Sequence, residues 1–212
     1  MNNAGKKTTG AEEGKALPLV EDFFSIQGEG YHMGKAAWFI RLGGCDVGCS
    51  WCDTPYSWDY DIYPMVDTDL IVQNAVNSGT NSVVVTGGEP LMWDLNYLCS
   101  GLIRNKIRTF IETSGTYPLS GKWNWICLSP KKNMPPGKEI CKVADELKVI
   151  IEERDDFIWA EKYRMRVSKK CRLYLQPEWN SFEKIIPEIV DFVRKNQVWR
   201  ISLQAHKYMN IP

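Results

Sequence analysis

The chain has 212 residues, of which 44% are hydrophobic, and this is enough for one domain with its own core. Its 26 lysines and arginines balance 26 aspartates and glutamates, so the charge gives no reason to expect binding to nucleic acid or to a membrane surface. No apolar run approaches the ~20 residues that span a bilayer, and no apolar signal segment follows the start. Seven cysteines without a secretory signal indicate the reducing cytoplasm.

Residues 1–16 are small, polar and charged, so we expect a disordered leader, followed by a single domain over residues 17–212. Short runs of β-branched and aromatic residues predict strands at 19–25, 37–42, 82–86, 109–112, 125–128, 146–150, 172–175 and 199–203. Capping residues and composition predict helices from Asp67 or Thr68 to Gly79 and over 95–106, 157–170 and 182–196. Irregular chain is expected up to Met65, and loop rather than helix over 132–145.

The alternation of strand and helix favours parallel strands joined by right-handed crossovers. The connections after Glu112 and Leu128 look too short or too broken for a helix. We therefore predict an α/β fold, an incomplete TIM-like barrel of parallel strands with few helices. Functional loops of such folds gather at the carboxyl ends of the strands, and every unusual motif of this chain directly follows a predicted strand.

Cys45, Cys49 and Cys52 form a CxxxCxxC segment, whereas the other four cysteines are scattered singly. A closed structural zinc site usually takes four ligands in two spaced pairs, and no second pair is present. An iron–sulfur cluster held by three thiolates leaves one iron without a protein ligand, where chemistry can occur. The remaining interpretation, a disulfide plus a free thiol in a secreted domain, conflicts with the missing signal segment.

A second motif, Thr86-Gly87-Gly88-Glu89-Pro90, ends another predicted strand. Two glycines let a ligand approach the backbone, and the glutamate can meet an ammonium group. A simple strand-ending turn would explain the glycines and the proline, but not their pairing with CxxxCxxC. Together the two motifs resemble the signatures of the radical S-adenosylmethionine superfamily, in which the open iron binds the methionine part of S-adenosylmethionine.

Further segments resemble the 7-carboxy-7-deazaguanine synthase family, namely residues 24–30, 41–45, 51–54, 112–115, 128–131, 175–177 and 206–207. The resemblance covers nearly everything from Phe23 to Pro212. It implies an enzyme that converts 6-carboxy-5,6,7,8-tetrahydropterin to 7-carboxy-7-deazaguanine with loss of ammonia, in the biosynthesis of queuosine and other 7-deazapurines. A 5′-deoxyadenosyl radical would start the reaction by taking a hydrogen from substrate C6, and the cofactor would be regenerated.

The resemblance also implies roles for individual residues. Cys45, Cys49 and Cys52 would hold a [4Fe–4S] cluster, and Thr54 would bind Mg²⁺ beside the substrate. Contacts to S-adenosylmethionine are implied for Trp51, Cys52, Asp53, Gly88, Ser129, Pro130, Lys131, Gln176, Pro177, Glu178 and Trp179. Contacts to the substrate are implied for Ile26, Gln27, Gly28, Glu29, Arg41, Thr86, His206 and Pro212, the last through its carboxylate. Trp179 and the final residues depart from the usual family pattern.

Family resemblance further implies a homodimer and a flavodoxin- or ferredoxin-type reductant. From the balanced charge and the lack of a long apolar run we expect neither a nucleic acid nor a membrane as partner. Two other functions stay open at this point. A glycyl-radical enzyme activase would share both motifs and act on a partner protein, but it should lack the Gln27-Gly28-Glu29-Gly30 loop and the Arg41 lead-in. A non-catalytic iron–sulfur electron carrier needs neither an open iron nor strand-end glycines.

Overall fold

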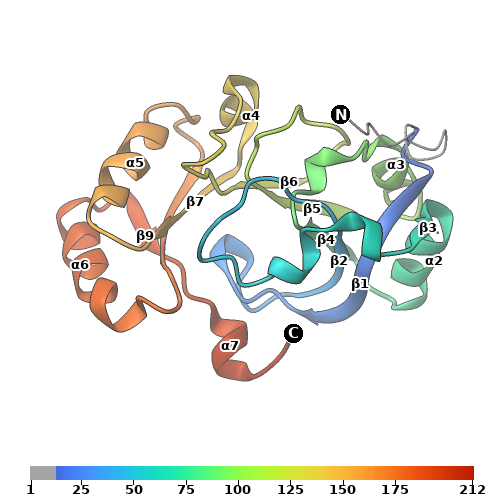
Figure 1. Cartoon of the computed structure of the whole chain (residues 1–212), viewed down its shortest axis with the longest axis horizontal. Coiled ribbons are helices and arrows are strands. Elements are labelled where there is room, and N and C mark those ends of the chain that lie inside the picture. The colour runs from blue at the N-terminus through green and yellow to red at the C-terminus, as the bar shows by residue number, and fades with distance from the viewer. Residues whose placement is uncertain (1–12) are drawn as a thin grey trace, which may run out of the picture.

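The computed structural model describes residues 13–212, and its centre is a single nine-stranded sheet in the order β3-β1-β2-β4-β5-β6-β7-β8-β9. From β2 to β9 each neighbouring pair is parallel, whereas β1 pairs antiparallel with both β2 and β3. The sheet curves into a partial barrel with helices along its outer side (Figure 1). The predicted incomplete TIM-like barrel is therefore confirmed, with an antiparallel edge that the alternation of elements did not reveal.

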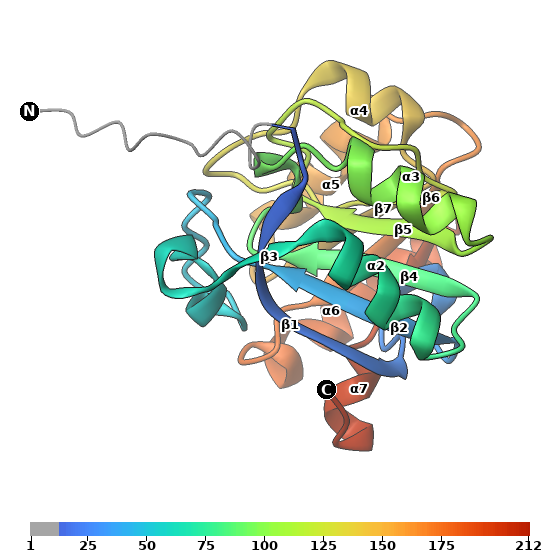
Figure 2. The ribbon, with the colours of Figure 1, turned by 90° about the vertical axis from the view of Figure 1, so that its right-hand side faces the viewer.

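The strands are β1 Ala16–Ile26, β2 Ala36–Leu42, β3 Met65–Asp67, β4 Ser82–Gly87, β5 Arg108–Thr113, β6 Trp125–Leu128, β7 Glu146–Ile151, β8 Arg172–Pro177 and β9 Trp199–Ile201. The α-helices are α2 Thr68–Asn77, α3 Asn96–Arg104, α4 Lys138–Val143, α5 Asp155–Arg164, α6 Phe182–Lys195 and α7 Ala205–Met209. Four short 3₁₀ turns are η1 Gly30–His32, η2 Pro55–Ser57, η3 Tyr60–Ile62 and η4 Pro90–Met92. Figure 2 shows α2 and α3 side by side on the outer face of the sheet.

Local chemistry explains where α2 begins and ends. The Asp67 side chain caps its first turn by accepting from the Asp69 N–H at 2.8 Å. Gly79, with φ of +72°, follows the helix in the left-handed conformation that glycine adopts without strain. The predicted start at Asp67 or Thr68 and stop near Gly79 are thus confirmed.

Three expectations about the elements were wrong or incomplete. The stretch expected to be irregular ends in β3, a three-residue strand too short to show any periodicity. The link 132–145, expected to be loop, contains α4, because Ile140 and Cys141 are buried in the core and anchor a short helix there. Helix α5 starts two residues earlier than predicted and ends at Arg164 rather than at residue 170.

Most of the predicted leader, residues 1–12, lies outside the described residues, and β1 begins at Ala16. No helix within residues 13–212 combines the length and apolar character needed to cross a membrane.

Apolar side chains form two cores. The larger core lies between the sheet and its helices, and a smaller one of Ala37, Phe39, Val84 and Phe110 lies inside the barrel. Residues of η1 fill the space beside this inner core. The His32 ring stacks on Phe110 with centroids 4.6 Å apart, and the Tyr31 ring stacks on Trp125 at 4.7 Å. We call Tyr31, His32, Phe110 and Trp125 the barrel floor.

Candidate functional site

One cavity of about 520 Å³ lies at the carboxyl ends of the parallel strands, where the predicted motifs meet. Its lining contains every residue that the sequence analysis predicted for the cluster, S-adenosylmethionine, Mg²⁺ or the substrate, except Pro130. Pro130 is buried, and its carbonyl accepts from the Trp159 indole at 3.4 Å. The fold thus brings together segments that are spread from Ile26 to Pro212.

The cysteine loop forms one wall of the cavity. Cys45, Cys49 and Cys52 are free, partly exposed thiols. Two backbone hydrogen bonds join the start of this loop to the chain that follows it. Gly44 N donates to Ser57 O at 2.8 Å, and Cys45 N donates to Trp58 O at 3.0 Å. Among residues 13–212, no three His, Cys, Asp or Glu side chains are close enough together to hold a single metal ion. A four-iron cluster takes its three thiolates at separate irons, so three thiols spread along one cavity wall fit that larger centre.

Two neighbouring loops fix the shape of the cysteine loop. The Tyr117 hydroxyl donates to Asp46 Oδ2 at 2.5 Å, and this bond is the main reason why the pKa of Tyr117 rises to about 12. The Asn133 amide donates to the carbonyls of Val47 and Gly48 at 3.2 and 2.8 Å. Neither Tyr117 nor Asn133 carried a signal in the sequence, since each belongs to a loop without a recognisable motif.

The Gly87-Gly88-Glu89 segment packs directly against the start of the cysteine loop. A Cβ atom at Gly88 would lie 2.8 Å from the Cβ of Cys45 and closer still to the Gly44 carbonyl. Glu89 N donates to the same Gly44 carbonyl at 2.7 Å. The glycines therefore permit close packing of two backbones, a reason that differs from the ligand approach expected from the sequence.

Glu89 is buried, and its carboxylate is engaged within the protein. One oxygen accepts from Leu91 N and from the Thr113 hydroxyl, and the other accepts from the backbone and hydroxyl of Ser114. The side chain thereby ties the end of β4 to the end of β5. Its expected contact with an ammonium group stays a prediction.

Other residues that were predicted for the cofactor follow β6 and β8 and line the same cavity. Lys131 Nζ donates to the Ser129 hydroxyl at 2.7 Å and lies 5.0 Å from the centre of the Trp51 ring, a cation–π contact. Burial lowers the pKa of Lys131. Glu178 accepts from the backbone of Asn180 and Ser181 and so shapes the turn after β8.

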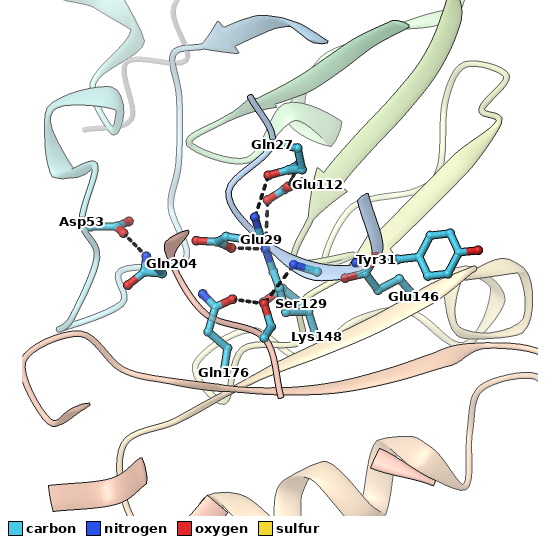
Figure 3. Close-up of polar contacts among 12 residues, drawn as sticks. Gln27, Glu29, Tyr31, Asp53, Glu112, Ser129, Glu146, Lys148, Gln176 and Gln204 are labelled. Atoms are coloured by element: carbon cyan, nitrogen blue, oxygen red, sulfur yellow. Dashed lines mark hydrogen bonds and ion pairs between the residues drawn. The ribbon is translucent and has the colours of Figure 1, made fainter. Parts of the chain in front are cut away.

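A buried charged cluster lies on the substrate side of the cavity (Figure 3). Lys148 of β7 forms ion pairs with Glu29 and with Glu112, at 3.1 Å from the Glu112 carboxylate, and Gln27 Nε2 donates to Glu112 at 2.8 Å. Burial by itself would lower the pKa of Lys148, but the two carboxylates outweigh it and hold this pKa well above its usual value. Burial would raise the pKa of Glu29, and Lys148 outweighs it, so that pKa is lowered.

Sequence reasoning missed Lys148 as a site residue, and it treated Glu112 only as part of a resembling segment. The available signal for Lys148 was a single charge within the apolar run of β7. A lysine in the middle of a buried strand needs a partner, which points to a carboxylate elsewhere in the fold.

Arg41 and Thr86 are partners in the parallel pair of β2 and β4, and both line the cavity. Arg41 Nε donates to Glu21 on β1 at 2.7 Å, and Tyr56 donates to the same carboxylate oxygen at 3.3 Å. Glu21 therefore orients the guanidinium group, whose terminal nitrogens form no hydrogen bond within residues 13–212. Arginine suits this purpose because its planar group recognises a carboxylate in a bidentate manner.

The carboxyl-terminal segment folds back over the cavity. The Gln204 amide donates to Asp53 at 2.8 Å (Figure 3), and Lys207 pairs with the same carboxylate at 3.2 Å. The backbone of Ala205 donates to Gly28 O at 2.9 Å, and the His206 ring packs where a side chain on Gly28 would have to lie. The Ser25 hydroxyl donates to a Pro212 oxygen at 2.9 Å, which holds the final residue at the cavity.

The profile of the radical SAM superfamily matches residues 39–126. A 7-carboxy-7-deazaguanine synthase of Flavobacterium psychrophilum is 53% identical, and the match covers 95% of each chain. The synthase of that name from a Synechocystis species is 46% identical over 92% of this chain and 94% of its own.

Solved structures agree with these relatives. The crystal structure of QueE from Escherichia coli matches 92% of this chain and 97% of its own, with a TM-score of 0.78 and 29% sequence identity. SuiB of Streptococcus suis, solved with S-adenosylmethionine bound, is 14% identical with a TM-score of 0.50, and it shows a shared fold alone. On this evidence the chain belongs to the 7-carboxy-7-deazaguanine synthase family of radical SAM enzymes.

Proposed function

We propose that the cavity is the active site of a 7-carboxy-7-deazaguanine synthase that uses 6-carboxy-5,6,7,8-tetrahydropterin and releases ammonia. The observation that carries the proposal is the meeting of two unlike walls in one cavity. Three thiols line one wall, and the cluster of Lys148, Glu29 and Glu112 lines the other. An electron carrier has no use for the second wall, and neither has an enzyme whose substrate is a protein backbone.

On the cofactor wall, Cys45, Cys49 and Cys52 would hold a [4Fe–4S] cluster. When bound, the cluster and S-adenosylmethionine would supply the radical chemistry at substrate C6. The protein supplies the binding site that positions the cofactor. Trp51 and Lys131 offer a flat face backed by a cation, and Gln176 lies at the end of β8, where its side-chain oxygen accepts from Ser202 at 2.7 Å.

On the substrate wall, charge complementarity indicates the orientation of the pterin. Its amino group and ring N–H groups form an edge of donors, which Glu29 and Glu112 can meet as acceptors. Its carboxylate carries the opposite charge to Arg41, which lines the same cavity. Lys148 lowers the pKa of Glu29 and so keeps that carboxylate ionised, and it also forms an ion pair with Glu112.

The test is anaerobic reconstitution of the full chain with iron and sulfide, followed by incubation with reductant, S-adenosylmethionine and the carboxytetrahydropterin. We expect 7-carboxy-7-deazaguanine in several-fold excess over the enzyme, since the cofactor is regenerated. Formation of 5′-deoxyadenosine only with a protein partner would identify an activase instead. A reducible cluster that forms neither compound would identify an electron carrier.

We also propose that Thr54 binds Mg²⁺ beside the substrate. Thr54 lines the same cavity as the substrate wall, and its hydroxyl lies 3.7 Å from Cys52 Sγ. Magnesium takes few protein oxygens and keeps positions for substrate and water. Thr54→Val keeps the side-chain shape and removes the oxygen, so we expect lower activity that higher Mg²⁺ partly restores. The same activity and the same Mg²⁺ dependence in both proteins would refute this role.

The remaining partners follow from the same function. We propose a flavodoxin- or ferredoxin-type protein as the electron donor, because the cysteine loop reaches the surface through Asp46, Gly48 and Ser50. A cytoplasmic location suits seven free cysteines, since thiols persist in a reducing compartment. The homodimer expected from the family is testable by light scattering of the purified chain.

A further inference from the structure

A second, much smaller cavity lies between the barrel floor and the buried charged cluster. Its volume is about 10 Å³, at the lower limit for one water molecule. Glu29 and Glu112 border it together with Gln27, and His32 and Glu146 border it as well. The cavity is therefore polar, and it touches the substrate-binding side chains from behind.

Two buried polar atoms at this cavity have no hydrogen-bond partner within residues 13–212, namely Glu146 Oε1 and His32 Nε2. Glu146 is 2% exposed, and its other oxygen, Oε2, accepts from Tyr31 N at 3.2 Å (Figure 3) and from the Trp125 indole at 2.9 Å. A buried polar atom left without a partner costs free energy, so native proteins fill such positions, often with an ordered water.

The neighbours of His32 determine which of its nitrogens carries the proton. Lys35 Nζ lies 3.2 Å from His32 Nδ1, and an ammonium group can only donate. Nδ1 must therefore accept, which places the proton of a neutral ring on Nε2, facing the small cavity. Burial, together with the charges of Lys35 and Arg108, lowers the pKa of His32 to about 4, so the ring is neutral at pH 7.

We propose that the small cavity holds one ordered water that accepts from His32 Nε2 and donates to Glu146 Oε1, and that this water makes His32 a positioning residue for the substrate wall. The second hydrogen of the water can be donated to an acceptor among Gln27, Glu29 and Glu112, which border the same cavity. Such a water satisfies three polar groups at once, the usual number for a buried site.

The consequence for substrate binding follows from the loop that carries Gln27 and Glu29. This loop continues directly into η1, and its backbone is held at Gly30 by the Ser202 hydroxyl at 2.9 Å and at Tyr31 by Glu146. The water adds a support beneath the side chains themselves. Without this water, Glu29 and Glu112 still form ion pairs with Lys148, but no hydrogen bond through the water links them to His32 of the barrel floor.

The direct test is a crystal structure of the reconstituted enzyme at a resolution that shows ordered waters. We expect a density peak at hydrogen-bond distance, about 2.6–3.2 Å, from both His32 Nε2 and Glu146 Oε1. An empty cavity in the wild type, or a direct bond between His32 and Glu146, would overturn the proposal. This arm needs no substrate and is therefore independent of the proposed function.

The second test, which rests on the proposed function, compares two variants of η1. His32→Phe keeps the ring that stacks on Phe110 and removes the donor, so we expect no density peak and a substrate KM raised about fivefold, with kcat and iron content unchanged. Tyr31→Phe is the matched control, because Tyr31 does not line the small cavity and its hydroxyl points away from Glu146 and Glu29 (Figure 3). It should keep both the peak and the wild-type KM.

A wild-type KM in His32→Phe, measured on a folded and iron-loaded protein, would refute the positioning role. If the wild type itself does not turn over the pterin, the proposed function fails while the density peak still decides the water site.

Discussion

The two walls of the large cavity are built in opposite ways. The cofactor wall consists of short, local segments, the cysteine loop and Gly87-Gly88-Glu89, which contact each other through backbone atoms. The substrate wall consists of single side chains from distant parts of the chain, with Lys148 lying 119 positions from Glu29 and 36 from Glu112. Local segments leave motifs in a sequence, whereas long-range ion pairs do not.

The walls also differ in what they need from a ligand. The three thiols of the cofactor wall are partly exposed, and their natural partner is a metal centre. The carboxylates of the substrate wall already have a buried cation, so the wall is charged and ordered before any substrate arrives. Changes on the cofactor wall should therefore affect cluster loading, and changes on the substrate wall should affect stability and substrate binding.

The largest effect is expected from a cluster ligand. Cys52→Ala removes one of three thiolates, so reconstituted iron and the brown colour should be lost, and product formation should fall below detection. Cys99→Ala is the control, because Cys99 is a buried core residue far in sequence from the loop. Iron content and visible absorbance measure the result. Retained iron in Cys52→Ala together with its loss in Cys99→Ala would contradict the assignment.

Lys148→Met tests the substrate wall. It leaves Glu29 and Glu112 without their shared cation, so the free energy of unfolding should fall by about 3 kcal/mol, while iron loading stays normal. Lys132→Met removes a surface lysine that pairs with Glu153 and Asp156 and should cost at most about 1 kcal/mol. Urea unfolding measures both variants. Equal losses would show that the buried cluster contributes no more than a surface pair.

The same variant predicts a change in pH dependence. The pKa of Glu29 is lowered in the folded state from its usual value of 4.5. Its ion pair therefore contributes its full stabilisation at pH values above 4.5. This contribution is lost as the pH falls through the lowered value. Lys148→Met should therefore lose less stability on acidification than the wild type does, as measured by unfolding from pH 7 to pH 3. A parallel loss in both proteins would contradict the direction assigned to Glu29.

An intermediate effect is expected at the contact between the two glycine segments. In Gly88→Ala the new methyl group would meet Cys45 and the Gly44 carbonyl, so the loops must separate, at a cost of about 1–3 kcal/mol and with weaker cluster retention. Gly137→Ala is the control, since within residues 13–212 an added Cβ there would approach only the Gly115 carbonyl, at 4.0 Å. Thermal unfolding and iron release to a chelator report both effects. Undisturbed loading in Gly88→Ala would show that the close packing is dispensable.

The smallest effect concerns His32. Its pKa is about 4 in the folded protein and 6.5 when unperturbed, so only the unfolded chain takes up a proton as the pH falls from 6.5 to 4. The stability of the wild type should therefore fall more over this range than that of His32→Phe, by about 1 kcal/mol because solvent screens part of the shift. Lys35, Arg108, Tyr31 and Glu146 face His32 and are kept in both proteins. If stability depended on pH in the same way in both proteins, His32 would not contribute to the pH dependence of stability.

The difference between local segments and long-range contacts also explains which features could be predicted from the sequence. The barrel, the cysteine loop and the glycine segment could be predicted, because each depends on neighbouring residues. Except for Pro130, the predicted site residues line one cavity, because the carboxyl ends of the strands converge in this fold. The sequence did not reveal the roles of Lys148, Tyr117 and Asn133. Each of these residues contacts a partner at least 71 positions away, and the last two also lie in loops without a motif. Helix α4 was missed for a related reason, since only tertiary burial of Ile140 stabilises so short a helix.

The bond between Ser25 and Pro212 joins residues 187 positions apart, and this separation has a consequence for biosynthesis. The cysteine loop and its glycine partner are complete once the ribosome has made the first half of the chain, whereas α7 and the contacts of Asp53 with Gln204 and Lys207 form only at the end. Contacts between such distant positions carry a large loop-closure cost and slow the folding of the chain. During translation the thiols are therefore made before the carboxyl-terminal segment that completes the cavity around them.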